Sequence, residues 1–191
     1  MAMDSVKEKY DFRVRWEPFM LRPNTPPEGS PKPAQYTDPN NPRVAALKQS
    51  GADVGLDFTY KCPVFPNTIK PHVLMEYAKD VDDGEKQNQV AELLFHKYFT
   101  DGDALGDTTL LDVASAAGLD KDQLLSRLTD QSKLEGALNK ALSWSNKGIS
   151  GVPTFYMNGQ KMFSGAQDKD TFIRVFEIVA DKFPLQTTSK S

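Results

Sequence analysis

The chain is short of the residues that build disulfides and metal centres. Its 191 residues include one cysteine, Cys62, so no disulfide can form within the chain. The two histidines, His72 and His96, lie apart in the sequence. Because a structural zinc site needs four ligands at defined spacing, we expect no metal. The low cysteine content is typical of a reducing compartment, and the predicted location is cytoplasmic.

Long hydrophobic runs and an excess of charge are also absent. The apolar runs are only a few residues long, far below the ~20 needed to cross a bilayer. The first nine residues carry mixed charge and no apolar core, which argues against a signal peptide. With 23 basic and 26 acidic residues the net charge is −3, which offers no basic face for nucleic acid. We therefore expect neither a membrane nor a nucleic-acid partner, and the oligomeric state stays open.

The first regular pattern alternates apolar and charged residues. Tyr10, Phe12, Val14 and Trp16 are separated by charged residues, and Pro18 closes the run. A period of two with one apolar face predicts a β-strand over residues 10–17.

Proline dominates the next stretch. Eight prolines between Pro18 and Pro42 predict a long loop without helix. A short helix is expected from Arg43 to Ser50, ended by Gly51.

Helical periodicity then governs residues 67–147. Apolar residues recur three and four positions apart in five successive segments, which predicts five helices. The residues expected at the helix starts are Asn67 or Thr68, Asp107, Asp120 and Ser132.

The chain returns to strand near its C-terminal end. Thr154–Met157 and residues 161–163 flank the pair Asn158-Gly159, which fits a type I′ hairpin turn. Asp168 is expected to cap a final helix that ends at Pro184. The sequence thus predicts an α/β domain with a mainly helical insertion. We divide it into residues 1–62, the helical insertion 63–147, a ββα part 148–184 and a disordered tail 185–191.

The most specific motif is the stretch Gly151-Val152-Pro153-Thr154-Phe155. It resembles the DsbA-like branch of the thioredoxin superfamily. Trp16-Glu17-Pro18-Phe19, and Pro66-Asn67-Thr68 followed by His72, are similar to the FrnE-type proteins within that branch. The resemblance implies a thioredoxin-like α/β fold and a cis peptide bond before Pro153. It also implies that Gly151, Val152 and Pro153 position the substrate, with His72 lining the cleft beside them.

The resemblance also implies chemistry that this sequence does not carry. The family uses a Cys-x-x-Cys pair at the start of its first helix, and residues 1–191 contain no such pair. Residues 1–9 look like the end of that helix, so we expect a shortened form without the N-terminal βα unit and without dithiol activity. Cys62 is a weak catalytic candidate because the neighbouring Lys61 would favour its thiolate. A semi-buried structural cysteine is the favoured interpretation.

Gly165-Ala166-Gln167 gives a second candidate site before the Asp168 cap. In the related kappa-class glutathione transferases the equivalent turn receives a glutathione carboxylate, so glutathione is a candidate ligand. A plain helix cap is the favoured alternative.

Three functions remain open at this point. The first is a thiol-disulfide oxidoreductase whose cysteines precede Met1. The second is a glutathione-dependent isomerase or transferase related to the hydroxychromene carboxylate isomerases. The third is a redox-inert peptide-binding module. The expected partner is a thiol- or disulfide-bearing protein or small molecule, and no other cofactor is implied.

Overall fold

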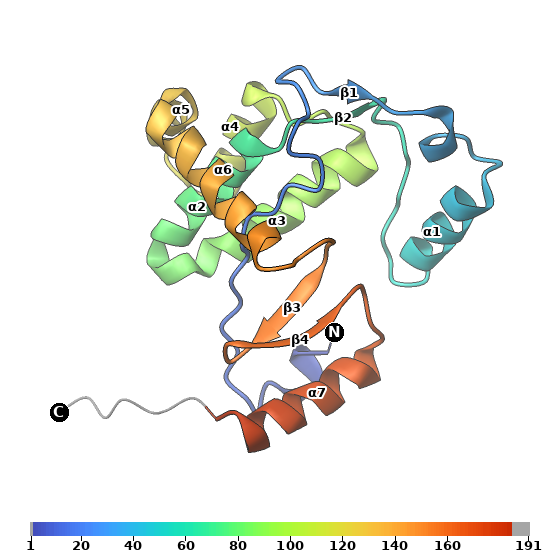
Figure 1. Cartoon of the computed structure of the whole chain (residues 1–191), viewed down its shortest axis with the longest axis vertical. Coiled ribbons are helices and arrows are strands. Elements are labelled where there is room, and N and C mark those ends of the chain that lie inside the picture. The colour runs from blue at the N-terminus through green and yellow to red at the C-terminus, as the bar shows by residue number, and fades with distance from the viewer. Residues whose placement is uncertain (1, 185–191) are drawn as a thin grey trace. The chain divides into compact units, whose positions relative to one another are not determined.

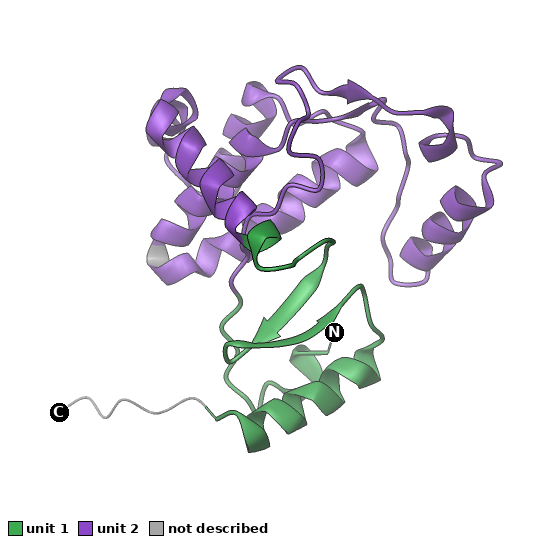
Figure 2. Cartoon of the chain, in the orientation of Figure 1, with its two compact units in different colours: residues 1–14, 144–191 green, residues 15–143 purple. Residues whose placement is uncertain are grey.

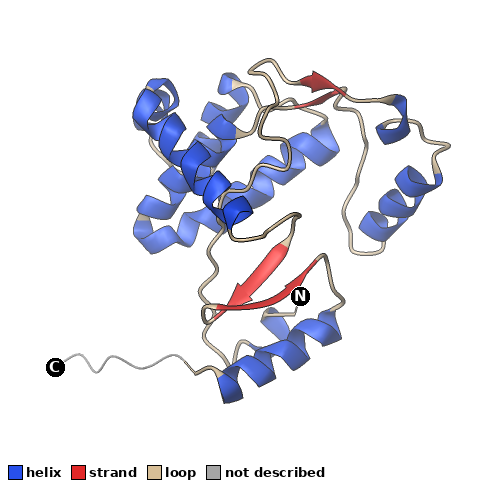
Figure 3. Cartoon of the chain, in the orientation of Figure 1, coloured by secondary structure: helices blue, strands red, loops and turns tan. Residues whose placement is uncertain are grey.

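Helices dominate the computed structural model, which describes residues 2–184 (Figures 1 and 3). In this part of the chain the strands form two separate antiparallel pairs, β1 with β2 and β3 with β4. In chain order the elements are η1 (Asp4–Val6), β1 (Ser30–Pro31), η2 (Ala34–Tyr36), α1 (Pro42–Ala52), β2 (Val64–Phe65), α2 (Ile69–Asp80), η3 (Asp82–Gly84), α3 (Glu85–Phe95), η4 (His96–Asp101), α4 (Asp107–Ala116), α5 (Lys121–Thr129), α6 (Gln131–Asn146), β3 (Thr154–Met157), β4 (Gln160–Ser164) and α7 (Lys169–Lys182). The η elements are 3-10 turns, except η4, which is a π-helical turn.

Contacts divide the chain into two units (Figure 2). The first, here called the hairpin unit, comprises residues 1–14 and 144–191. The second, the helical unit, comprises residues 15–143. By this division the proline-rich segment belongs with the helices. Among the described residues no helix is long and apolar enough to cross a membrane.

The helical unit is built around the five predicted helices, α2 to α6, and their prediction is confirmed. Leu74 of α2, Leu110 of α4 and Leu124 of α5 are completely buried. Each such leucine contributes roughly 1.5–3 kcal/mol by leaving water. The remaining members of this core are Val73, Tyr77, Ala78, Val90, Leu94, Val113, Ala114, Ala117, Leu119, Leu128 and Ala137.

Two of the predicted helix starts are confirmed. Asn67 Oδ1 accepts a hydrogen bond from Ile69 N at 3.0 Å, and Asp120 Oδ1 accepts one from Gln123 N at 2.9 Å. Each carboxyl or amide oxygen satisfies a backbone N–H that the helix leaves unpaired.

Two other helix starts were predicted at the wrong residue. Asp107 is the first residue of α4 rather than its cap, and its carboxylate pairs with Lys70 at 2.7 Å. Helix α6 begins at Gln131, before the predicted Ser132. Asp130 accepts from Ser132 N at 2.8 Å, so the carboxylate one position farther upstream supplies the cap. Asp130 and Ser132 are both residue types that suit the start of a helix, and the sequence does not distinguish them.

The strand predicted over residues 10–17 is wrong. These residues form a loop, because a strand exists only with a neighbour to pair with, and no described strand pairs with them. At Trp16 the buried side chain of Gln87 on α3 pairs with the backbone in place of a neighbouring strand. Its Oε1 accepts from Trp16 N at 2.8 Å, and its Nε2 donates to Trp16 O at 2.9 Å and to Met75 O at 3.2 Å.

Ion pairs fasten the residues on either side of Trp16. Arg15 binds the Asp83 carboxylate at 3.0 Å, and Glu17 receives hydrogen bonds from Lys79 and Lys140. Lys140 also binds Glu76 at 2.7 Å. Burial opposes the charge on Glu17, but the two lysines outweigh it and lower the pKa of this carboxyl below its ordinary value.

The loop predicted for residues 18–42 contains regular structure after all. Ser30 pairs with Phe65 and Pro31 with Val64, and η2 follows. The pairing requires Gly29, which has φ +87° and approaches so closely that an added Cβ would lie 2.9 Å from Phe65 O.

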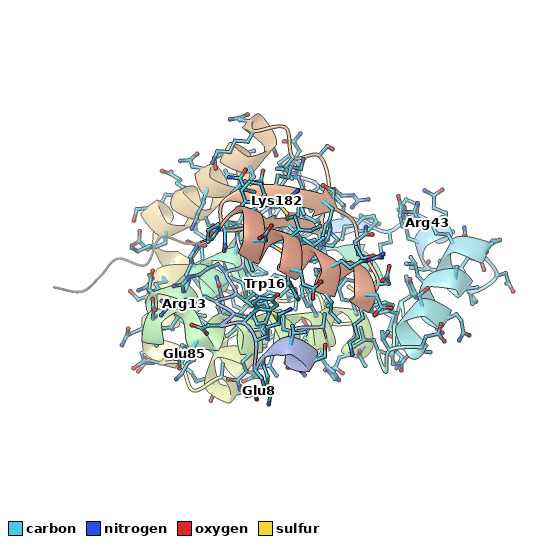
Figure 4. All side chains as sticks on the ribbon, turned by 90° about the horizontal axis from the view of Figure 1, so that it is seen from below. Glu8, Arg13, Trp16, Arg43, Glu85 and Lys182 are labelled. Carbon is cyan, nitrogen blue, oxygen red and sulfur yellow. The ribbon has the colours of Figure 1, made fainter. Side chains whose placement is uncertain are left out.

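Helix α1 is longer than predicted at both ends. It begins at Pro42, because Asn41 Oδ1 accepts from Arg43 N at 2.9 Å and proline suits the first helical position. Gly51 lies inside the helix instead of ending it, since the Phe58 ring packs where a Cβ would stand. Arg43 on this helix lies far to one side of Glu85 on α3 (Figure 4).

The hairpin unit contains β3, β4 and α7, as predicted. Asn158 has φ +47° and Gly159 φ +81°, the two positive angles that the tight turn needs. Asp168 caps α7 by accepting from Thr171 N at 2.8 Å.

Five phenylalanines fill the space between this hairpin and α7. The rings of Phe155, Phe163 and Phe172 have centroids 5.0–5.1 Å apart, and Phe12 contacts Phe176 at 4.8 Å. All five side chains remain half-buried. The predicted tail, residues 185–191, lies outside the described residues.

The contacts of Gln87 predict a large loss of stability when its amide is removed. In Gln87→Leu the N–H and C=O groups of the half-buried Trp16 lose their partner, at a cost of about 1–3 kcal/mol for each group left unpaired. We expect urea unfolding to show a loss of about 2–4 kcal/mol.

Gln89→Leu is the matched control, since Gln89 is exposed on the same helix with one long hydrogen bond of 3.4 Å to Ala116 O. It should change stability by less than about 0.5 kcal/mol. Equal stability of the two variants would contradict a role for Gln87 in holding residue 16.

Candidate functional site

The candidate site is the loop of Gly151, Val152 and Pro153 that leads into β3. Pro153 O accepts a hydrogen bond from Gly165 N at 2.8 Å, which joins this loop to the end of β4. Thr154 Oγ1 donates to Gly151 O at 2.8 Å and lies 3.0 Å from Ser164 Oγ. The Val152–Pro153 peptide bond is cis. The loop is therefore fixed on both sides of Val152.

Val152 itself is open to a ligand. Its side chain is 55% exposed, and neither its N–H nor its C=O forms a hydrogen bond with any described residue. Next to it, β3 pairs only with β4, so the other edge of β3 is not paired by any strand in residues 2–184. A free donor and a free acceptor beside an unpaired strand edge are what an extended peptide needs in order to bind.

Gly165, Ala166 and Gln167 connect β4 to α7. Gly165 has φ +88°, and the side chains of Ala166 and Gln167 are exposed. The first turn of α7 already holds an anion, because the Asp168 carboxylate accepts from both Thr171 N and Thr171 Oγ1. These hydrogen bonds lower the pKa of Asp168. A glutathione carboxylate would meet this negative charge, which favours the plain helix cap.

His72 lies on α2 in the helical unit, where it holds another segment in place. Its Nε2 is 3.0 Å from Phe19 O, and a carbonyl can only accept, so the imidazole donates. Burial lowers the pKa of His72, which keeps the ring neutral at pH 7. This contact gives His72 a structural role within its own unit.

Cys62 is shielded from solvent. Its side chain is 1% exposed, and its Sγ donates to Val64 O at 3.3 Å. A thiol in this position must first be uncovered before it can attack a disulfide. Within residues 2–184 no cluster of three or more His, Cys, Asp or Glu side chains has the arrangement of a metal site.

The hydroxyl pair of Thr154 and Ser164 was not singled out from the sequence. The hairpin register places Thr154 opposite Ser164, at the end where β3 starts and β4 stops. A predicted Asn-Gly turn sets the register in principle, but a register shift between Phe155 and Tyr156 moves the pairing by one residue. That irregularity has no signal in the sequence.

Comparison with known families identifies the class of protein. The family model for the DSBA-like thioredoxin domain matches residues 1–177. The chain therefore belongs to the DsbA-like thioredoxin family, a family of thiol-disulfide oxidoreductases. Its fold is the α/β thioredoxin-like fold with a helical insertion, as the sequence predicted. Among the curated proteins compared, none matches this chain.

A solved structure has a similar fold. A probable DsbA oxidoreductase from Streptomyces coelicolor superposes with a TM-score of 0.71 at 20% sequence identity. The match covers 87% of this chain and 74% of the other. At this identity the likeness concerns the fold.

The geometry of Gly165 predicts that an added methyl group destabilises the hairpin. An L-residue at φ +88° costs about 1–2 kcal/mol, although no atom lies within 4 Å of the added Cβ. We expect the free energy of unfolding of Gly165→Ala in urea to fall by about this amount, and amide exchange at residue 165 to be faster.

Gly151→Ala serves as the control, because this glycine also has open space around it but no positive φ. It should be neutral or slightly stabilising. If both alanines cost the same, the backbone angle at Gly165 is not the cause.

Proposed function

We propose that this chain binds an extended segment of a thiol- or disulfide-bearing polypeptide at Gly151, Val152 and Pro153. The observation that carries the proposal is the free backbone of Val152, with its N–H and C=O unpaired beside the open edge of β3. A peptide lying along this edge gains two hydrogen bonds at Val152 and packs a side chain against its exposed isopropyl group. Membership of a thiol-disulfide oxidoreductase family supports a substrate of this kind.

Backbone recognition suits a protein that acts on many sequences. Hydrogen bonds to Val152 would form with the main chain of the partner, which has the same donors and acceptors in nearly every polypeptide. Specificity then rests on the side chains around the loop. Tyr156, which is 41% exposed on β3, is the largest apolar side chain offered along this strand.

We further propose that residues 1–191 by themselves do not exchange dithiols. Disulfide exchange runs through a mixed disulfide that a second thiol must resolve, and this sequence has only Cys62. Because the Cys62 side chain is covered, it is a poor first nucleophile as well. A form of the protein with a Cys-x-x-Cys segment ahead of Met1 would supply the missing pair. Assignment to the FrnE-type branch and to the cytoplasm rests on the sequence motifs and on the low cysteine content.

Peptide binding at Val152 is tested by amide exchange and mutation. Reduced and alkylated insulin B chain serves as the extended ligand, which removes thiol chemistry from the measurement. We expect the bound peptide to slow exchange of the Val152 amide by about tenfold or more, since one new hydrogen bond contributes about 1 kcal/mol or more. Val152→Asp should weaken binding by at least about fivefold.

Ile178→Asp is the matched control, because this side chain on α7 is 47% exposed and also apolar. It should bind the peptide as the unmodified chain does. No change in exchange at Val152, or equal loss in both variants, would refute peptide binding at this loop.

The redox proposal is tested by the reduction of insulin disulfides with dithiothreitol as the electron source. The 191-residue chain and its Cys62→Ser variant should both proceed at the rate of dithiothreitol alone, because neither has a resolving thiol. Intact mass spectrometry of the protein from its source, against 21.3 kDa for this sequence, identifies which form is present. Turnover that survives the Cys62→Ser change would overturn the proposal.

A further inference from the structure

Two positive side chains of the helical unit lie against one aromatic ring. The guanidinium carbon of Arg22 is 3.8 Å from the centre of the Phe65 ring, and Lys32 Nζ is 5.6 Å from it. Lys32 Nζ also lies 4.6 Å from the centre of Tyr98. Neither cation forms an ion pair with a carboxylate of the described residues.

The fold holds these side chains in place. The pairing of Ser30 with Phe65 continues through a hydrogen bond from Lys32 N to Pro63 O at 2.8 Å, which sets Lys32 beside the ring. On the other side, Thr25 donates through both N and Oγ1 to Arg22 O. Asn67 Nδ2 then donates to Thr25 O at 2.7 Å, which ties the Arg22 turn to the start of α2.

Lys32 differs in this respect from several other lysines of the chain. Acidic residues outnumber basic ones, and Lys9, Lys79, Lys97 and Lys140 each bind a carboxylate. Lys32 is half-buried without such a partner, and burial lowers its pKa. Ring faces stabilise a cation by only about 0.5–2 kcal/mol, so they do not replace a counter-charge.

We propose that Arg22 and Lys32 bind a small dianion, either a phosphate group or a dicarboxylate. The guanidinium carbon lies 3.8 Å from the centre of the Phe65 ring, and no described residue accepts a hydrogen bond from this side chain, so its N–H groups are available for the bidentate hydrogen bonds that oxyanions accept. The ammonium of Lys32 supplies the second charge. This site lies within the helical unit, and the proposal does not depend on peptide binding at Val152.

The test is calorimetric titration of the full chain with inorganic phosphate, succinate and acetate at constant ionic strength. We expect phosphate or succinate to bind at least about tenfold more tightly than acetate, because a second charge-assisted contact is gained. Phosphate alone would mean that both cations meet one group, and succinate alone that each takes one carboxylate. Either result supports the site.

Substitutions then locate the binding. Arg22→Gln and Lys32→Gln should each weaken the better dianion by about tenfold or more, while Lys32→Arg retains the charge and binds within about threefold. Lys48→Gln is the control, because Lys48 is exposed on α1. Should Lys32→Gln fail to fold, the Arg22→Gln variant still tests the site, because the Arg22 side chain is exposed. Dianions that bind no better than acetate, or that bind the Arg22→Gln and Lys48→Gln variants equally, would overturn the proposal.

Discussion

The buried carboxamide of Gln87 is the interaction on which the path of the N-terminal segment depends. Residues 10–17 have no described strand beside them, so their backbone groups need other partners. Gln87 presents one acceptor and one donor in a plane, as a neighbouring strand would, and pairs with both groups of Trp16. A side chain thus does at one residue what a sheet does along its whole length.

Neighbouring contacts repeat this arrangement. Arg15, Glu17 and Phe19 are each held by a side chain from a helix: Arg15 from η3, Glu17 from α2 and α6, and Phe19 from α2. Their partners are charged or ring nitrogen groups with fixed geometry. The order of residues 15–19 therefore depends on contacts with the helices.

Much of this fold was predictable from local pattern alone. Periodicity found α2 to α6 and α7, because a helix satisfies its own backbone and needs only one apolar face. Alternation over residues 10–17 picks out Phe12 and Trp16, whose rings contact Phe176 and Phe95, but Val14 between them is exposed. It does not say whether a partner strand exists, since pairing is a property of the tertiary structure.

The same limit applies to Gly51 and to the candidate sites. A glycine near a helix end usually stops the helix, but here the Phe58 ring occupies the space a side chain would need. The stretch Gly151–Phe155 was singled out through its resemblance to the DsbA-like proteins, and its role in binding stays a prediction. Arg22, Lys32 and Phe65 are distant in sequence, and the pairing of β1 with β2 together with the hydrogen bond from Asn67 to Thr25 O brings them together.

The proposed recognition and the redox chemistry of the family need different groups. The redox chemistry needs two thiols, whereas the proposed recognition at Val152 would use backbone groups that any sequence provides. The hairpin unit also leaves part of its apolar surface exposed to solvent. An isolated two-stranded hairpin has marginal stability in water. The five phenylalanines of the unit remain half-buried between the hairpin and α7.

A peptide strand added along β3 would extend this two-stranded sheet. It would add a third strand to a hairpin that already packs against α7, and it would pair the backbone groups that β3 leaves open. A partner that binds only the folded hairpin stabilises it by mass action. Peptide binding at Val152, as proposed, would therefore be coupled to the order of the hairpin unit through one equilibrium.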